Sequence, residues 1–98
     1  MTQTTVLPTN SPDALLMAKK VLEHHGLIAF PTDTVYGLAS RLDSAKAIEG
    51  LFLAKGRDFN KAIAVLIGDV EQLSRVAREL PESALKLAAR FWPGALTL

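Results

Sequence analysis

Apolar residues recur at three- and four-residue steps soon after the start of the chain, which predicts an amphipathic helix. Residues 11–13 begin this helix with an N-cap serine, a first-turn proline and an acid that compensates the helix dipole. The expected apolar positions of the helix are Leu15, Ala18 and Leu22. Gly26 is expected to stop the helix, because glycine readily adopts the conformation that follows a helix C-terminus.

The same spacing predicts a second helix in the middle of the chain, with either Asp43 or Ser44 as its N-cap. Its side chains at helical steps are Ile48, Leu51, Phe52 and Lys55. Gly56 ends this helix.

Two more helices are predicted in the last third of the chain. Asp69 can cap the first, whose apolar positions are Leu73, Val76, Ala77 and Leu80. Pro81 can start the second, whose apolar positions are Ala84, Leu87, Ala88 and Phe91. Pro93 and Gly94 terminate it.

Short apolar runs alternate with these helices. Residues 27–30 end at Pro31, which predicts a buried strand that leads into a loop. Residues 62–67 are apolar throughout, which is typical of a central strand covered on both faces. Residues 95–98 begin another apolar run without a polar boundary, so we expect the chain to be truncated there. Strands alternating with helices predict an α/β fold class.

The composition is that of an ordinary globular domain. With 98 residues, 49% of them hydrophobic and 21% charged, the chain is expected to hold part of one domain over residues 1–98, with residues 1–10 as a flexible lead. Eleven basic and ten acidic residues give a net charge of +1, so any contact with RNA must be local. The absence of cysteine excludes disulfides, thiol redox chemistry and thiolate metal sites. No secretory signal and no apolar run of ~20 residues is present, so a cytoplasmic location is expected.

The densest chemical signal is the segment PTDTVYGL at residues 31–38, directly after the first predicted strand. Two hydroxyls, a carboxylate and a phenol lie at the C-terminal end of that strand, where open α/β sheets bind ligands. Such groups can hydrogen-bond a small polar substrate such as an amino acid. An equally weighted alternative is that Thr32, Asp33 and Thr34 only form a polar turn, while Tyr36 packs into the core.

A second cluster, Lys55-Gly56-Arg57, lies where the second predicted helix ends. Its two cations suit phosphate or carboxylate oxygens, with Arg57 as a bidentate fork and Lys55 as a point charge. The alternative is that basic residues stand near a helix C-terminus because the macrodipole favours them there. Lys61 is open to the same two interpretations.

Together with the segment FWPGALT at residues 91–97, these clusters resemble the YrdC-like threonylcarbamoyl-AMP synthase family. Members carry a Pro-Thr-Asp/Glu-Thr-Val-Tyr-Gly-Leu segment, then Lys-x-Arg, then Phe-Trp-Pro-Gly-x-Leu-Thr, in the order found here. The resemblance extends from about residue 11 onwards. It implies an open twisted mixed sheet with flanking helices.

The resemblance also implies a nucleotidyltransferase activity for tRNA modification. The amine of L-threonine captures bicarbonate or carbon dioxide, and the resulting carbamate attacks the α-phosphate of ATP. By resemblance, Lys55 and Arg57 are the catalytic and ATP-binding residues, with Mg²⁺ bridging phosphate oxygens, and no protein metal ligand is assigned. Thr32, Thr34 and Tyr36 would bind L-threonine. Implied partners are tRNA and the downstream threonylcarbamoyl transferase machinery.

The chain departs from the family pattern at two positions and stops short of a third. Asp58 stands where many relatives have proline, and Leu66 stands where they have a pocket histidine, whose role is not carried over. The serine and asparagine residues that complete the family's nucleotide site lie beyond residue 98. The isolated piece is therefore expected to be inactive.

Two other function classes stay open. One is a noncatalytic module that binds tRNA or double-stranded RNA on a basic concave surface, which the small net charge disfavours. The other is a carbamoyl-transfer domain of a larger maturation protein, which the short polar start disfavours. Neither a Walker nor a Rossmann glycine pattern is present, so ATP is implied by the resemblance alone.

Two pairs of adjacent ring side chains, one of histidines and one of aromatic residues, are expected to have structural rather than ligand-binding roles. His24 and His25 have no partner at metal-ligand spacing, so we expect them to be solvated at a helix end. Phe91 and Trp92 are expected to pack rather than to stack on a base.

Overall fold

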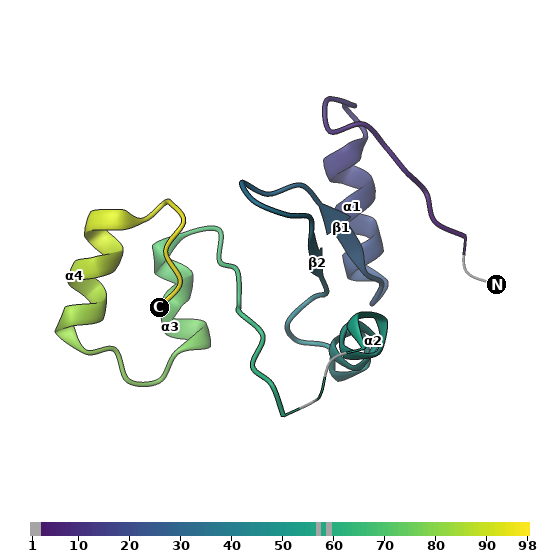
Figure 1. Cartoon of the computed structure of the whole chain (residues 1–98). Helices are drawn as coiled ribbons and strands as arrows, with labels where there is room; N and C mark the ends of the chain where they lie inside the picture. Colours follow the sequence, from purple (N-terminus) through teal and green to yellow (C-terminus); the bar gives the residue numbers. More distant parts are fainter. Residues whose placement is uncertain (1–2, 57, 59) are drawn as a thin grey trace. The chain divides into compact units, whose positions relative to one another are not determined.

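The computed structural model describes residues 3–56, 58 and 60–98 (Figure 1). It divides into two compact units, Met1–Lys61 and Ala62–Leu98. The prediction that residues 1–98 belong to one domain stays a prediction. In the described part of the chain, no helix is both long enough and apolar enough to cross a membrane.

A β-hairpin carries the polar segment of the first unit. Strand β1 (Ile28–Phe30) pairs antiparallel with β2 (Gly37–Ala39), and Phe30 lies opposite Gly37. The predicted strand over residues 27–30 is therefore confirmed to within one residue. Strand β2 was not predicted, because its three residues follow a polar segment and show no alternation of their own.

Helix α1 (Ala14–Glu23) contacts β1. It begins later than predicted: Asp13 occupies the N-cap position, and the Ser11 hydroxyl accepts the Asp13 N–H at 3.3 Å. Leu15 is 85% exposed, so its predicted inward orientation is wrong. The half-buried positions of α1 are Ala14, Ala18, Val21 and Leu22. Apolar residues occur on two sides of this helix, and contact with β1 decides which side is covered.

Helix α2 (Ala45–Lys55) provides the buried core of the first unit. Ser44 is its N-cap, which decides between the two predicted residues, since the Ser44 hydroxyl accepts the Ala47 N–H at 3.1 Å. Gly56 ends the helix with φ of 63°, a left-handed conformation that glycine adopts without a steric penalty. Its buried side chains are Ala47, Leu51 and Phe52. The prediction of this helix is confirmed.

The second unit begins with a segment for which the prediction is wrong. Residues 62–67 form an irregular trace rather than a central strand (Figure 1). Leu66 is 84% exposed and Val65 is 46% exposed, so this segment is not covered on both faces. A strand exists only where a neighbouring strand completes its hydrogen-bond ladder, and the only described sheet consists of β1 and β2. The apolar run at residues 95–98 also forms no strand.

The helices of the second unit follow the prediction in part. Asp69 caps the 3₁₀-helix η1 (Val70–Gln72) by accepting the Glu71 N–H at 3.0 Å, and α3 (Leu73–Val76) follows at once. The predicted helix extended to Leu80, but that residue precedes Pro81, which disfavours helical backbone. Helix α4 (Glu82–Phe91) is confirmed.

The aromatic pair after α4 is only partly covered. Trp92 is half-buried, and its indole N–H donates to the Leu96 carbonyl oxygen at 2.8 Å. Phe91 is 53% exposed, so its expected packing is not found among the described residues. Trp92 therefore has a structural hydrogen bond that closes the turn after α4.

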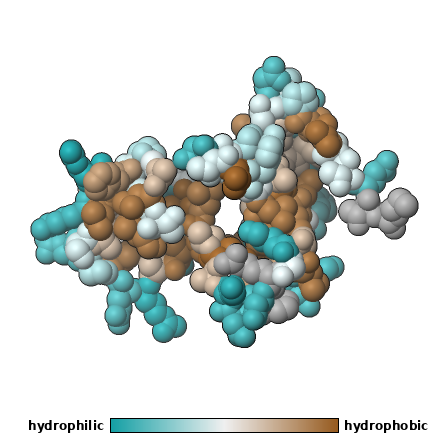
Figure 2. Space-filling model, in the orientation of Figure 1, coloured by the Kyte–Doolittle hydropathy of each residue, from teal (hydrophilic) through white to brown (hydrophobic). Residues whose placement is uncertain are grey.

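The buried apolar core is small in the described part of the chain. It consists of Ala47, Leu51 and Phe52 in the first unit and of Ala88 in the second. Figure 2 shows apolar side chains exposed on the visible face of both units. Because burial of apolar surface is the main driving force of folding, so small a core contributes little to the stability of the described residues.

Candidate functional site

The polar loop at residues 31–36 joins the two strands of the hairpin. The Thr32 hydroxyl accepts the Thr34 N–H at 3.2 Å and donates to the Val35 carbonyl oxygen. The polar turn, which is the alternative to a ligand-binding loop, is therefore present. Tyr36 is 78% exposed, however, so the prediction that it packs into the core is wrong. The three predicted threonine-binding residues, Thr32, Thr34 and Tyr36, are all exposed on this loop.

A close approach between the strands fixes the base of this loop. A Cβ atom added to Gly37 would lie 2.9 Å from Cζ of Phe30 and within 3.3 Å of two further ring atoms. The phenyl ring thus occupies the space where any larger residue would place its side chain. The Phe30 ring therefore explains sterically why a glycine stands at position 37.

Lys55 lies in the last turn of α2 and is exposed, where the sequence placed it. Arg57, the second predicted cation, lies outside the described residues. The next described residue, Asp58, accepts the Asn60 N–H at 2.9 Å through its carboxylate. Lys55 is therefore carried by a different element from the 31–36 loop, within the same unit.

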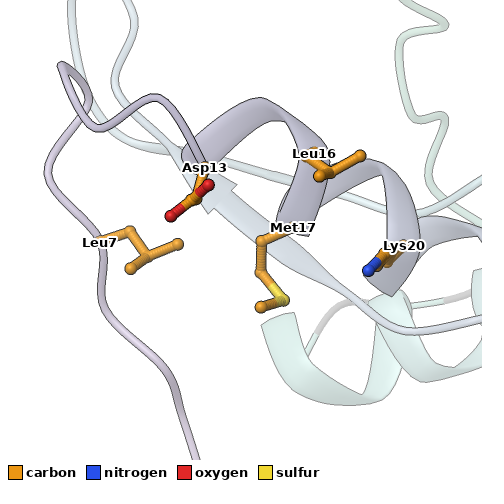
Figure 3. Close-up of a pocket in the computed structure, with 5 residues that line it drawn as sticks. All are labelled: Leu7, Asp13, Leu16, Met17 and Lys20. Atoms are coloured by element: carbon orange, nitrogen blue, oxygen red, sulfur yellow. The ribbon is translucent and has the colours of Figure 1, made fainter.

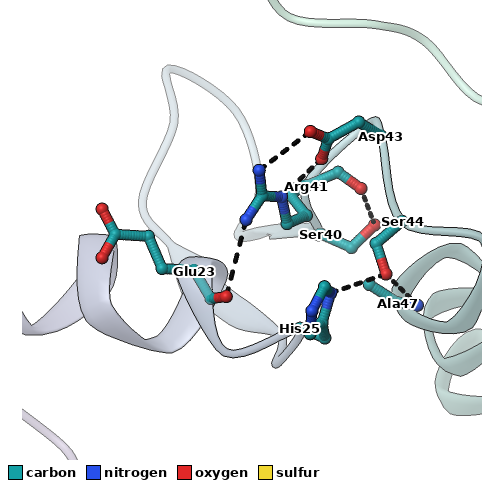
Figure 4. A network of polar contacts seen from close by, with 7 residues as sticks. All are labelled: Glu23, His25, Ser40, Arg41, Asp43, Ser44 and Ala47. Atoms are coloured by element: carbon teal, nitrogen blue, oxygen red, sulfur yellow. Dashed lines mark hydrogen bonds and ion pairs between the residues drawn. The ribbon is translucent and has the colours of Figure 1, made fainter.

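A polar network joins the end of α1 to the start of α2 (Figure 4). His25 Nδ1 lies 2.8 Å from the Ser44 hydroxyl oxygen, and Arg41 forms a bidentate ion pair with Asp43. Arg41 Nη1 also reaches the Glu23 carbonyl oxygen at 3.5 Å. This network was not predicted, because His25 and Ser44 are 19 positions apart and neither shows a pairing signal.

The ion pair sets the charge state of this network. The hydrogen bond from Arg41 lowers the pKa of the Asp43 carboxyl, and the same bond raises the pKa of Arg41. Because the pKa of Asp43 is lowered on folding, the stabilisation by the pair is present above the ordinary carboxyl pKa and is lost as the pH falls through the lowered value. Both groups are solvent-exposed, so the contribution is small.

Replacing Ser44 by alanine is expected to destabilise the start of α2 by about 1–2 kcal/mol. The substitution removes the acceptor of the Ala47 N–H and leaves His25 Nδ1 without its partner. Amide hydrogen exchange of Ala47 in the full-length protein should accelerate by roughly 5- to 30-fold. Ser83→Ala, at an exposed position of α4 that caps nothing, is the matched control. Equal exchange in both variants would contradict a capping role.

A surface pocket of about 250 Å³ lies elsewhere in the first unit (Figure 3). It is lined by Leu7, Asp13, Leu16, Met17 and Lys20. None of the predicted site residues lines it. No cluster of three or more acidic, histidine or cysteine side chains suited to a metal ion is found in the described ranges.

The sequence matches a known protein family over most of its length. The family model of the Sua5, YciO and YrdC proteins, described as "Telomere recombination", matches residues 20–98. The chain belongs to this family. The match includes the 31–36 loop, α2 with Lys55 and the segment after α4, so the resemblance stated from the motifs is confirmed.

Two relatives within the Sua5/YrdC family are named threonylcarbamoyl-AMP synthase. The protein of Bacillus subtilis strain 168 is 41% identical over 92 residues, which cover 94% of this chain and 26% of that protein. The protein of Pyrococcus abyssi strain GE5 / Orsay is 49% identical over 72 residues, which cover 74% of this chain and 21% of that protein. The chain thus spans about a quarter of the length of these relatives.

The fold is also similar to a solved Sua5 structure. The crystal structure of P. abyssi Sua5 complexed with L-threonine superposes with a TM-score of 0.76 at 42% sequence identity, covering 80% of this chain and 23% of that one. The expected YrdC-like α/β fold class is confirmed by this similarity.

Proposed function

We propose that the protein containing this chain is a threonylcarbamoyl-AMP synthase. It would convert L-threonine, bicarbonate and ATP to threonylcarbamoyl-AMP and pyrophosphate for threonylcarbamoyladenosine modification of tRNA. The observation that carries this proposal is the exposed polar loop at residues 31–36 in a chain 42% identical to a Sua5 protein complexed with L-threonine. Identities of 41% and 49% to proteins named for this activity support it.

The 31–36 loop is the proposed binding segment for L-threonine. It carries Thr32, Thr34 and Tyr36, and the phenol of Tyr36 is 78% exposed. An amino acid presents an ammonium group that needs acceptors and a carboxylate that needs donors. Hydroxyl and phenol groups can serve as either, which suits a zwitterionic ligand.

Lys55 and Arg57 are the proposed catalytic and ATP-binding cations. In the reaction, the threonine amine attacks bicarbonate, water leaves, and an N-carboxylate forms. An oxygen of this carbamate then attacks the α-phosphorus of ATP while the bond to the β-phosphate breaks and pyrophosphate leaves. Both reactants are anions, so cations placed between them offset repulsion and the charge that accumulates in the transition state. Lys55, exposed at the end of α2, is accessible for this role.

Magnesium is proposed only as the ion that accompanies ATP. The described residues offer no cluster that fits a protein-held metal ion. Mg²⁺ in nucleotide sites is held largely by phosphate oxygens and water, so this does not conflict with the proposed substrate. No step of the proposed reaction is assigned to a metal bound by this chain.

The proposed partners follow from the product. Threonylcarbamoyl-AMP is a reactive mixed anhydride, so a downstream threonylcarbamoyl transferase must consume it, and a local contact with tRNA is proposed on the same grounds. A cytoplasmic location is proposed because tRNA is modified there.

Pyrophosphate release by the full-length protein tests this function. With ATP and bicarbonate, release is expected only when L-threonine is added, because the carbamate is the nucleophile. L-Valine, which is isosteric but lacks the hydroxyl, is the matched control and should support much slower release. Threonine-independent release would count against the proposal. No release together with an RNA affinity that falls steeply with salt would instead favour the RNA-binding alternative.

A further inference from the structure

We propose that Thr32 is a positioning residue of the threonine site and does not donate a hydrogen bond to the threonine carboxylate. This inference rests on the proposed function, and it differs from the resemblance, which assigned Thr32 to the ligand. It is drawn from the hydrogen bonds of the 31–36 loop.

The hydrogen-bonding capacity of the Thr32 hydroxyl is largely used within the loop. A hydroxyl has one donor hydrogen and two acceptor lone pairs. The donor goes to the Val35 carbonyl oxygen, and one lone pair accepts the Thr34 N–H at 3.2 Å. Thr32 therefore has no hydrogen left to donate to the carboxylate of an amino acid unless the loop opens.

The side chains of Thr34 and Tyr36, in contrast, are free to hydrogen-bond a ligand. Within the described part of the chain, neither the Thr34 hydroxyl nor the Tyr36 phenol makes a hydrogen bond. Tyr36 is 78% exposed, and Thr34 is exposed. Both groups keep their full capacity for a ligand.

The two bonds of Thr32 fix the backbone that carries these free groups. They span residues 32–35, while the strand pair Phe30 and Gly37 fixes the base of the loop. A loop held in one conformation before binding loses less entropy when the ligand arrives. The role of Thr32 is thus to hold Thr34 and Tyr36 in place for threonine.

Three variants of the full-length protein test this role with two measurements. The first measurement is the solvent exchange rate of the Thr34 amide without ligand, by NMR with ¹⁵N-threonine labelling. The second is the dissociation constant for L-threonine by calorimetry. Thr32→Val, isosteric but without the hydroxyl, should accelerate Thr34 exchange and weaken binding, each by roughly tenfold.

The other two variants separate positioning from contact. Thr32→Ser keeps the hydroxyl and should restore both values to near those of the unmodified protein. Tyr36→Phe removes a free group, so it should weaken binding while leaving Thr34 exchange unchanged.

The inference would be overturned if Thr32→Val weakened threonine binding without changing Thr34 exchange in the free protein, because Thr32 would then be a direct contact. Faster exchange with unchanged affinity would overturn it too. An unmodified protein that binds no L-threonine would refute the proposed function itself, and the inference with it. These outcomes are distinguishable, because the last appears before any substitution is made.

Discussion

Replacing Lys55 by methionine is expected to lower threonine-dependent pyrophosphate release by roughly 10²- to 10³-fold. Methionine keeps the length and the helix propensity of lysine but removes the ammonium group. The proposed reaction brings an anionic carbamate to a polyphosphate, so a missing cation raises the energy of the transition state. Initial rates with saturating L-threonine and bicarbonate, measured over a range of ATP concentrations, would separate a loss of ATP affinity from a loss of turnover.

Lys46→Met is the matched control for this experiment. Lys46 is exposed in the first turn of the same helix, α2, and the substitution changes the net charge equally. Its rate should stay within about twofold of the unmodified protein, because distant exposed charges are screened by salt. Equal losses in both variants would show that only net charge matters. An unchanged rate in Lys55→Met would contradict the catalytic role of Lys55. The lysine would then be explained by the helix macrodipole, which favours cations near a helix C-terminus.

Replacing Gly37 by alanine is expected to destabilise the hairpin by about 1–3 kcal/mol and to weaken threonine binding with it. The new Cβ would lie 2.9 Å from Cζ of Phe30, so the ring or the strand must move. A shift of Gly37 also moves Tyr36, which immediately precedes β2. Amide exchange across β1 and β2 in the full-length protein, with calorimetry of L-threonine binding, measures both effects.

Gly50→Ala supplies a control with the opposite expected sign. Gly50 lies inside α2, and a Cβ atom there would have no neighbour within 4 Å. Alanine is favoured over glycine in a helix interior, so this variant should stabilise α2 by about 0.5–1 kcal/mol. Destabilisation by both variants would mean that the space around Phe30 does not explain the glycine at position 37.

Part of the tertiary structure follows from interactions that are local in the chain. The start of α2, predicted at either Asp43 or Ser44, the end of α2 at Gly56 and the start of α4 after Pro81 each depend on residues within one helical turn. These are the features that the sequence analysis placed correctly. The polar loop after β1 was found in the same way, because its composition contrasts with the apolar run before it.

Other features depend on residues that are distant in the sequence. Residues 62–67 have the apolar pattern of a central strand but form none, because a strand needs a partner as well as a pattern. The orientation of α1, which leaves Leu15 at the surface, depends on its contact with β1. The hydrogen bond between His25 and Ser44 joins residues 19 positions apart, and no periodicity within either segment predicts it.

The sequence by itself determined the family motifs, the end of α2 at Gly56, the start of α4 after Pro81 and the position of the polar loop, because local backbone chemistry and composition decide these. Only the tertiary structure decided that Gly37 lies under the ring of Phe30, that Tyr36 is exposed, and that the Thr32 hydroxyl is used inside the loop. The physical reason is that strand pairing and the conformation of the loop determine which atoms each side chain contacts. Both depend on atoms that the linear pattern does not bring together.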